Sequence, residues 1–176
     1  MSRAWLRKGL PWSFAAIAVL FLFGCPFSSD TPMADPATGL QDKSLAGIWT
    51  MVDPESGDRI TLSFHPFNEH EYVAVSQDAS KLETYRVFAT TVSGERFLNV
   101  RQIDSDDTGW YFARYQLSGS QLFLRFVDDG LFRSQVFATP VDLHNFVRDH
   151  IADPLLYAPA DDDPMDSVWD RVPDQK

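Results

Sequence analysis

The chain has 176 residues, a formal net charge of −10, an aromatic content of 14% and one cysteine. Its negative charge would repel the phosphates of nucleic acids and anionic lipid headgroups, so we expect no nucleic-acid partner. A single cysteine excludes an internal disulfide, and the fold must therefore depend on packing alone.

The first 24 residues have the pattern of a secretory signal. Basic residues at positions 3, 7 and 8 precede an apolar run from 14 to 23, which is shorter than the roughly 20 residues that a membrane-spanning helix needs. The run ends in LFGC, residues 22–25, which resembles the lipobox of bacterial lipoproteins apart from the bulky Phe23. The alternative is an uncleaved signal anchor in which Cys25 has no role.

The lipobox resemblance implies that residues 1–24 are a signal peptide and that the sulfur of Cys25 carries lipid. The partner would then be a membrane, to which several acyl chains hold a protein far better than one chain does. Because Pro26, and not aspartate, follows the cysteine, the resemblance implies the outer membrane, facing the periplasm, if the cell is Gram-negative. No free thiol would remain for cysteine chemistry.

The sequence after the cysteine predicts a flexible tether. Residues 26–41, PFSSDTPMADPATGLQ, are rich in Pro, Ser, Asp and Ala and show no apolar periodicity. We therefore assign residues 25–42 to a lipidated tether and residues 43–176 to the folded domain. Sixteen extended residues reach roughly 50 Å, which would let the domain stand clear of the bilayer.

The domain contains short segments rich in Val, Ile, Phe, Tyr and Thr, separated by turn sequences such as SGE, SGS and DDG. Such short connections favour antiparallel neighbours. We predict an all-β fold, an antiparallel up-and-down β-barrel of about eight strands. The candidate strands are Leu45–Val52, Arg59–Phe67, Glu71–Ser76, Thr84–Val92, Arg96–Ile103, Trp110–Ser118, Gln121–Val127 and Phe132–Ala138.

One C-terminal α-helix and a short final strand follow the predicted barrel strands. The segment TPVDLHNFVRDHI, residues 139–151, begins with Thr139 as N-cap, Pro140 and Asp142, a capping-box-like start. Its apolar residues share one face, so we expect the helix to lie against the barrel wall or to close one end. The final stretch VWDRV, residues 168–172, could add one more strand.

Period-two alternation indicates which side chains face the interior. Ile60, Leu62 and Phe64 share one face of their strand. The same alternation turns two further sets inward: Tyr111, Ala113, Tyr115 and Leu117, and Leu122, Leu124 and Phe126. The opposite faces of these last two strands are also apolar, because they carry Phe112 and Phe123.

Leu45, Gly47 and Trp49 form an L-x-G-x-W pattern at the opening of the first strand. This pattern and the order of elements resemble the lipocalins and lipocalin-like calycins. In those proteins the Gly-x-Trp pair starts the first strand, the indole plugs the closed end of an eight-stranded barrel, and a helix and a short strand follow. A tryptophan that simply fills a β core is the alternative.

The sequence also departs from that family. It has no second family signature in the later turns and no cysteine for the usual disulfide. The terminal DRV, with Arg171, only faintly resembles the family's arginine that packs over this tryptophan.

No candidate for catalysis or metal binding has a diagnostic pattern. His65 and His70 flank a turn with Glu69 and Glu71, but their spacing does not distinguish a zinc site from exposed turn histidines. The run DSDDTG, residues 104–109, lacks the acidic residue that a calcium loop needs at its twelfth position. Acidic residues 161–163 and 166 are more typical of a solvated loop. We predict no enzyme activity, no metal and no cofactor.

We expect the barrel to bind or carry a small apolar ligand, with Tyr111, Tyr115, Leu124 and Phe126 lining its interior. The alternative is a filled barrel that serves as a structural or protein-interaction lipoprotein. Its envelope protein partner would then dock on the outer strand faces that carry Phe112, Phe123 and Val127.

Overall fold

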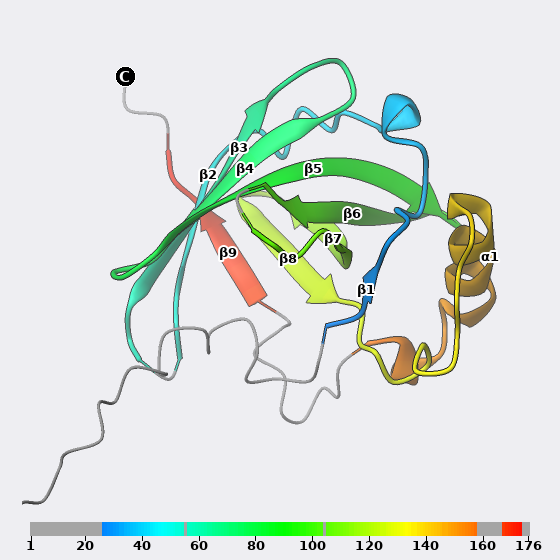
Figure 1. Cartoon of the computed structure of the whole chain (residues 1–176). Coiled ribbons are helices and arrows are strands. Elements are labelled where there is room, and N and C mark those ends of the chain that lie inside the picture. The colour runs from blue at the N-terminus through cyan, green and yellow to red at the C-terminus, as the bar shows by residue number, and fades with distance from the viewer. Residues whose placement is uncertain (1–25, 55, 104, 158–166, 174–176) are drawn as a thin grey trace, which may run out of the picture.

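The computed structural model describes residues 26–54, 56–103, 105–157 and 167–173, and it shows a β-sheet closed into a barrel (Figure 1). Eight antiparallel strands form the barrel, and each pairs with the next along the chain until β9 pairs with β2. This arrangement confirms the predicted up-and-down barrel. The barrel strands are β2 (Gly47–Val52), β3 (Arg59–Pro66), β4 (Tyr72–Gln77), β5 (Leu82–Val92), β6 (Glu95–Gln102), β7 (Trp110–Ser118), β8 (Gln121–Phe126) and β9 (Ser167–Arg171).

The eighth barrel strand is β9, and the strand predicted over Phe132–Ala138 does not form. Residues 131–137 adopt turns and irregular backbone outside the barrel. The apolar residues of this segment have the composition of a strand, but they are buried outside the barrel. The Phe132 ring stacks on Phe27, with ring centres 3.8 Å apart. β9 closes the barrel by pairing with β8 on one side and β2 on the other.

Residues 26–42, which we name the strap, are part of the folded domain, so the prediction of a flexible tether is wrong. The strap contains β1 (Ser28–Ser29), which pairs with β7, and a short 3-10 helix η1 (Pro36–Thr38). Phe27 and Met33 are 8% and 1% exposed. These two apolar side chains are buried against the outer wall of the barrel. The composition of the segment, which is rich in Pro and Ser, gave no indication of this burial.

The predicted helix forms as α1 (Pro140–His150), and its start is confirmed in detail. Thr139 is the N-cap, and its side chain and that of Asp142 complete a capping box. Leu143 and Val147 are fully buried. Figure 1 shows α1 and β1 on the same side of the barrel, so the helix covers the wall and does not close an end. A second 3-10 helix, η2 (Pro154–Leu156), follows it.

The structure contains two apolar cores, one inside the barrel and one outside it. The interior core is made by Leu45, Trp49, Ile60, Phe64, Tyr72, Ala74, Val87, Ala89, Leu98, Tyr115, Leu122, Leu124 and Trp169. The outer core lies between the wall, the strap and α1, and is made by Phe27, Met33, Phe88, Val92, Phe97, Trp110, Phe112, Val127, Phe132, Leu143, Val147, Leu156 and Tyr157. Two cores explain why β7 is apolar on both faces.

Candidate functional site

The candidate site is the barrel interior, which is sealed at one end. We name this end the floor; here β2, β4, β6 and β8 begin, and residues 42–46 run across it. The Asp42 carboxylate accepts hydrogen bonds from Arg96 at 2.5 Å and from the Tyr115 hydroxyl at 3.2 Å. The Tyr72 hydroxyl donates to the Asp42 carbonyl at 2.6 Å. Burial, reinforced by this carboxylate, raises the pKa of Tyr72 to about 12.

Arg171 packs over Trp49 at the floor. Its guanidinium carbon lies 4.4 Å from the centre of the indole ring. The same guanidinium donates to the Ala46 carbonyl at 3.1 Å and to the Ser44 carbonyl. Trp49 is fully buried and donates from Nε1 to the Leu45 carbonyl at 2.9 Å. The Trp49 ring therefore connects the end of β9 to the start of β2.

Gly47 is required at this place for two reasons. Its φ of +129° is one that other residues rarely adopt, and a Cβ built there would lie 3.0 Å from Nη1 of Arg171. A side chain at position 47 would therefore strain the backbone and push the guanidinium off the tryptophan. The Gly-x-Trp pair and Arg171 form one structural unit, although the sequence only faintly indicated the arginine.

The opposite end, which we name the mouth, is less tightly packed. Met51, Leu62, Tyr85 and Val100 pack against the interior core, yet each stays only partly buried. All four lie within four residues of a strand end at the mouth. Two further partly buried side chains of the interior core, Ala46 and Leu117, lie at the floor, so partial exposure is concentrated at the mouth without being confined to it. Near the floor, the fully buried members of the core include Trp49, Tyr72 and Leu122.

Polar groups surround the mouth. The Tyr111 hydroxyl donates to the Asp107 carboxylate, and burial together with this bond raises the pKa of Tyr111 to about 12. The Glu83 carboxylate accepts from the Gln102 amide at 3.1 Å and pairs with Lys81 at 2.7 Å. Burial, and then the nearby Glu83, raise the pKa of Tyr85. A ligand that entered here would pass a ring of hydrogen-bonding groups before it reached apolar side chains.

The four residues predicted to line a ligand site separate into two pairs. Tyr115 and Leu124 are 4% and 5% exposed and belong to the interior core. Tyr111 and Phe126 are only partly buried and lie at the mouth ends of β7 and β8. Sequence reasoning did not single out Met51, Tyr85 or Val100 for a ligand site. The alternation along β2, β5 and β6 carried that information, because it turns these positions inward.

The outer strand faces proposed for a protein partner are largely covered. Phe112 and Val127 are fully buried in the outer core. Phe123 remains half-buried and pairs with the exposed Val168 of β9. The apolar residues that motivated a docking face are therefore explained mainly by the strap and α1.

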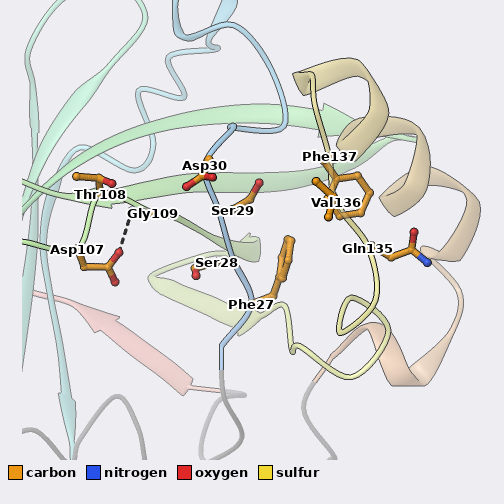
Figure 2. A pocket seen from close by; sticks show the side chains of 10 residues that line it. All are labelled: Phe27, Ser28, Ser29, Asp30, Asp107, Thr108, Gly109, Gln135, Val136 and Phe137. Atoms are coloured by element: carbon orange, nitrogen blue, oxygen red, sulfur yellow. Dashed lines mark hydrogen bonds between the residues drawn. The ribbon is translucent and has the colours of Figure 1, made fainter.

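An external hollow of about 300 Å³ lies where the strap passes the β6–β7 loop, and Figure 2 shows its lining. Ser28, Asp30 and Asp107 supply polar atoms, and the Phe137 ring supplies an apolar edge. The Asp107 carboxylate accepts from the Gly109 backbone N–H at 2.9 Å, the dashed line in Figure 2. A second hollow of about 370 Å³ lies between the strap and the start of α1.

The histidines considered as metal ligands bond to separate partners. His65 Nε2 lies 3.1 Å from the Ser63 hydroxyl, and His70 Nδ1 lies 3.1 Å from the Gly39 carbonyl oxygen. Within the described part of the chain, no three His, Cys, Asp or Glu side chains gather closely enough to hold a metal ion. Cys25, Asp104 and the acidic residues 161–163 and 166 lie outside the described residues.

Comparison with known proteins assigns no family: no family model, no curated protein and no solved structure matches the chain. Among the described residues, no helix has the length and apolar character needed to cross a membrane.

Proposed function

We propose that this chain is a lipid-anchored protein of the bacterial cell envelope, of the lipocalin-like type, that binds a small apolar molecule in the mouth half of its barrel. One observation carries the proposal: several inward-facing apolar side chains at the mouth, among them Met51, Leu62 and Val100, are only partly buried, whereas Trp49 at the floor is fully buried beneath Arg171. Binding sites of small apolar ligands have such a lining with a few polar groups at the entrance.

The floor supports the lipocalin-like part of the proposal. Gly47, Trp49 and Arg171 come from opposite ends of the domain and meet at the sealed end of an eight-stranded barrel. The sequence resemblance depended on Gly47 and Trp49, and the arginine contact adds a feature that the resemblance implied. The resemblance of residues 22–25 to a lipobox supports the anchoring of Cys25.

Charge at the mouth selects the class of ligand. Glu83 faces the interior with its side chain 13% exposed and pairs with Lys81. The turns at this end carry Asp53, Asp58, Asp78 and Asp107, which outnumber the cations Arg59 and Lys81. Such a concentration of negative charge repels an anion at the entrance. The ligand is therefore a neutral or cationic apolar molecule, and a fatty-acid anion is disfavoured.

Two valines provide a matched test of the binding site. Val100 faces the interior at the mouth, and Val75 lies on the outer face of β4, where it pairs with Ser63. In protein purified without its acyl chains, native mass spectrometry detects a co-purified apolar molecule, and titration with neutral, cationic and anionic forms of one apolar fluorophore measures affinity. Val100→Phe fills the mouth and lowers affinity, whereas Val75→Phe leaves it unchanged.

The contrary result is equally clear. If no molecule co-purifies and the fluorophore binds neither wild type nor Val75→Phe, the barrel is a filled scaffold, and the alternative of a structural or protein-interaction lipoprotein takes its place. Equal loss of binding in both variants would place the bound probe outside the barrel. Preference for the anionic fluorophore would refute the ligand class.

A further inference from the structure

The fixed strap leaves almost no free chain between Cys25 and the folded domain. Pro26 forms a β-bridge with Asp128, and the Phe27 N–H donates to the Val127 carbonyl at 2.9 Å. Consecutive Cα atoms are about 3.8 Å apart. The first residue held by the domain is therefore the immediate neighbour of the cysteine.

The strap is bound to the barrel along its length and resists being peeled away. The buried Phe27 ring stacks on Phe132. The Met33 N–H donates to the side chain of Asn99, a fully buried residue, at 2.8 Å. The Leu40 N–H donates to the Ala89 carbonyl at 2.8 Å. To release the strap as a tether, the protein would have to expose two apolar side chains and leave a buried amide without its partner.

We infer that the acyl chains on Cys25 hold one definite face of the domain against the bilayer, so that the anchor sets the orientation of the protein as well as its location. This inference rests on the proposed anchoring of Cys25. We name this face the anchor face and define it by Pro26, the turn at Asp128–Gly130, Val136 and Leu155. A tether of sixteen free residues would have let the domain rotate freely.

Contacts around Pro26 bring the Asp128–Gly130 turn and Leu155 together, and Val136 lies across the neighbouring hollow. The Asp128 N–H donates to the Leu156 carbonyl at 3.1 Å, next to Leu155. A Cβ built on Gly130 would lie 3.6 Å from the Leu155 carbonyl oxygen. Val136 lines the same hollow as Phe27 (Figure 2).

Two exposed apolar side chains fit the anchor face to a lipid surface. Val136 is 94% exposed and Leu155 is 64% exposed. Side chains of this kind gain free energy by entering the interfacial region of a bilayer. The face also carries Asp128 and Asp129, of which Asp129 pairs with Arg133 at 3.3 Å. Its carboxylates disfavour anionic lipid, so the acyl chains supply most of the attraction and the apolar side chains set the contact.

The test places one thiol at a time on the acylated protein. Because acylation consumes Cys25, an introduced cysteine is the only free thiol in the mature protein. Val136→Cys and Leu155→Cys label the anchor face, and Phe67→Cys labels the β3–β4 turn, where the side chain is 67% exposed. Each variant receives a polarity-sensitive fluorophore, and the acylated protein is reconstituted into vesicles of zwitterionic lipid that carry a quencher at headgroup depth.

The expected result is blue-shifted, strongly quenched fluorescence at positions 136 and 155 and water-like, unquenched fluorescence at position 67. A companion variant inserts a flexible Gly/Ser segment of about 16 residues between Cys25 and Pro26. It should retain acylation and thermal stability while the quenching at positions 136 and 155 falls to the level seen at position 67. The length of the link, and not the surface alone, would then be responsible.

Two failures are distinguishable. If radiolabelled palmitate does not mark Cys25 in the cell, the anchoring fails, and the orientation fails with it. If palmitate marks Cys25 but the labels at positions 136 and 155 are as unquenched as the label at position 67, the anchoring stands and the orientation is refuted. Quenching that is unchanged by the inserted segment would also overturn the role of the short link.

Discussion

Removal of the Arg171 side chain tests whether the contact at the floor stabilises the closed barrel. Arg171→Ala deletes the guanidinium that lies 4.4 Å from the Trp49 ring. It also deletes the donors to the carbonyls of Ser44 and Ala46. β9 is then joined to β2 by its ladder alone, and the full burial of Trp49 is lost on one face.

The size of the effect follows from the contacts that are lost. A partly desolvated cation–π contact contributes about 1 kcal/mol. Each of the two hydrogen bonds from the guanidinium contributes about 1 kcal/mol. This value is at the low end for a charged donor, because Arg171 is only partly buried and water can replace the guanidinium at both carbonyls. The free energy of unfolding should therefore fall by about 3 kcal/mol, which corresponds to a decrease in Tm of roughly 6–12 °C for a domain of this size.

Urea denaturation of wild type and two variants measures this loss. Arg133→Ala is the control, because Arg133 is an exposed arginine that pairs with Asp129 at 3.3 Å, and surface pairs contribute little. Its free energy of unfolding should change by less than about 0.5 kcal/mol. If Arg171→Ala is as mild as this control, the floor contact does not hold the barrel closed.

Three further predictions test the strap, Gly47 and the tyrosines. Phe27→Ala should lower the free energy of unfolding by about 3 kcal/mol, because it empties a buried stack, whereas Phe67→Ala should be nearly neutral; equal values would mean that the strap contributes no stability. Gly47→Ala should lower the free energy of unfolding by about 2 kcal/mol, because Gly47 has φ +129° and lies close to Arg171. Gly57→Ala should lower it less, because Gly57 has φ +74° but nothing within 4 Å of a Cβ built there; equal losses would mean that the backbone conformation alone is responsible. Tyr111, with its pKa raised from 10.0 to about 12, should ionise late in an absorbance titration, and the rise near pH 12 should shrink in Tyr111→Phe; an unchanged titration curve contradicts the burial of its hydroxyl.

The shift of Tyr111 also has a consequence for stability. Because the folded protein favours the neutral phenol, the contribution of Tyr111 is fully present below pH 10 and is lost as the pH rises towards 12. Wild type should therefore lose more stability than Tyr111→Phe over this interval. Denaturation midpoints measured across it provide the check.

The strap connects the proposed anchor to the proposed binding site. β1 pairs with the mouth end of β7, at Trp110 and Tyr111, and Tyr111 is one of the residues at the mouth. The strap therefore becomes part of the wall beside the mouth. With Cys25 acylated as proposed, this short link would hold the mouth at a constant distance from the bilayer.

Local sequence determined the strands of the barrel and its helix. Period-two alternation in β3 turned Ile60 and Leu62 inward, and the cap at Thr139 marked the start of α1. These features depend on neighbours a few residues apart, so a single chain displays them directly. The pattern of Gly47 and Trp49 is also local, and it correctly indicated that the barrel is sealed at the end where β2 begins.

Only the tertiary structure decided which apolar segments serve which core. Phe132 and Phe27 both bury aromatic rings outside the barrel, yet the sequence predicted a strand for one segment and a free tether for the other. Burial depends on which surfaces meet, and those surfaces come from residues far apart in the chain. For the same reason Arg171, 122 positions after Trp49, could be connected to its partner only once the barrel had closed.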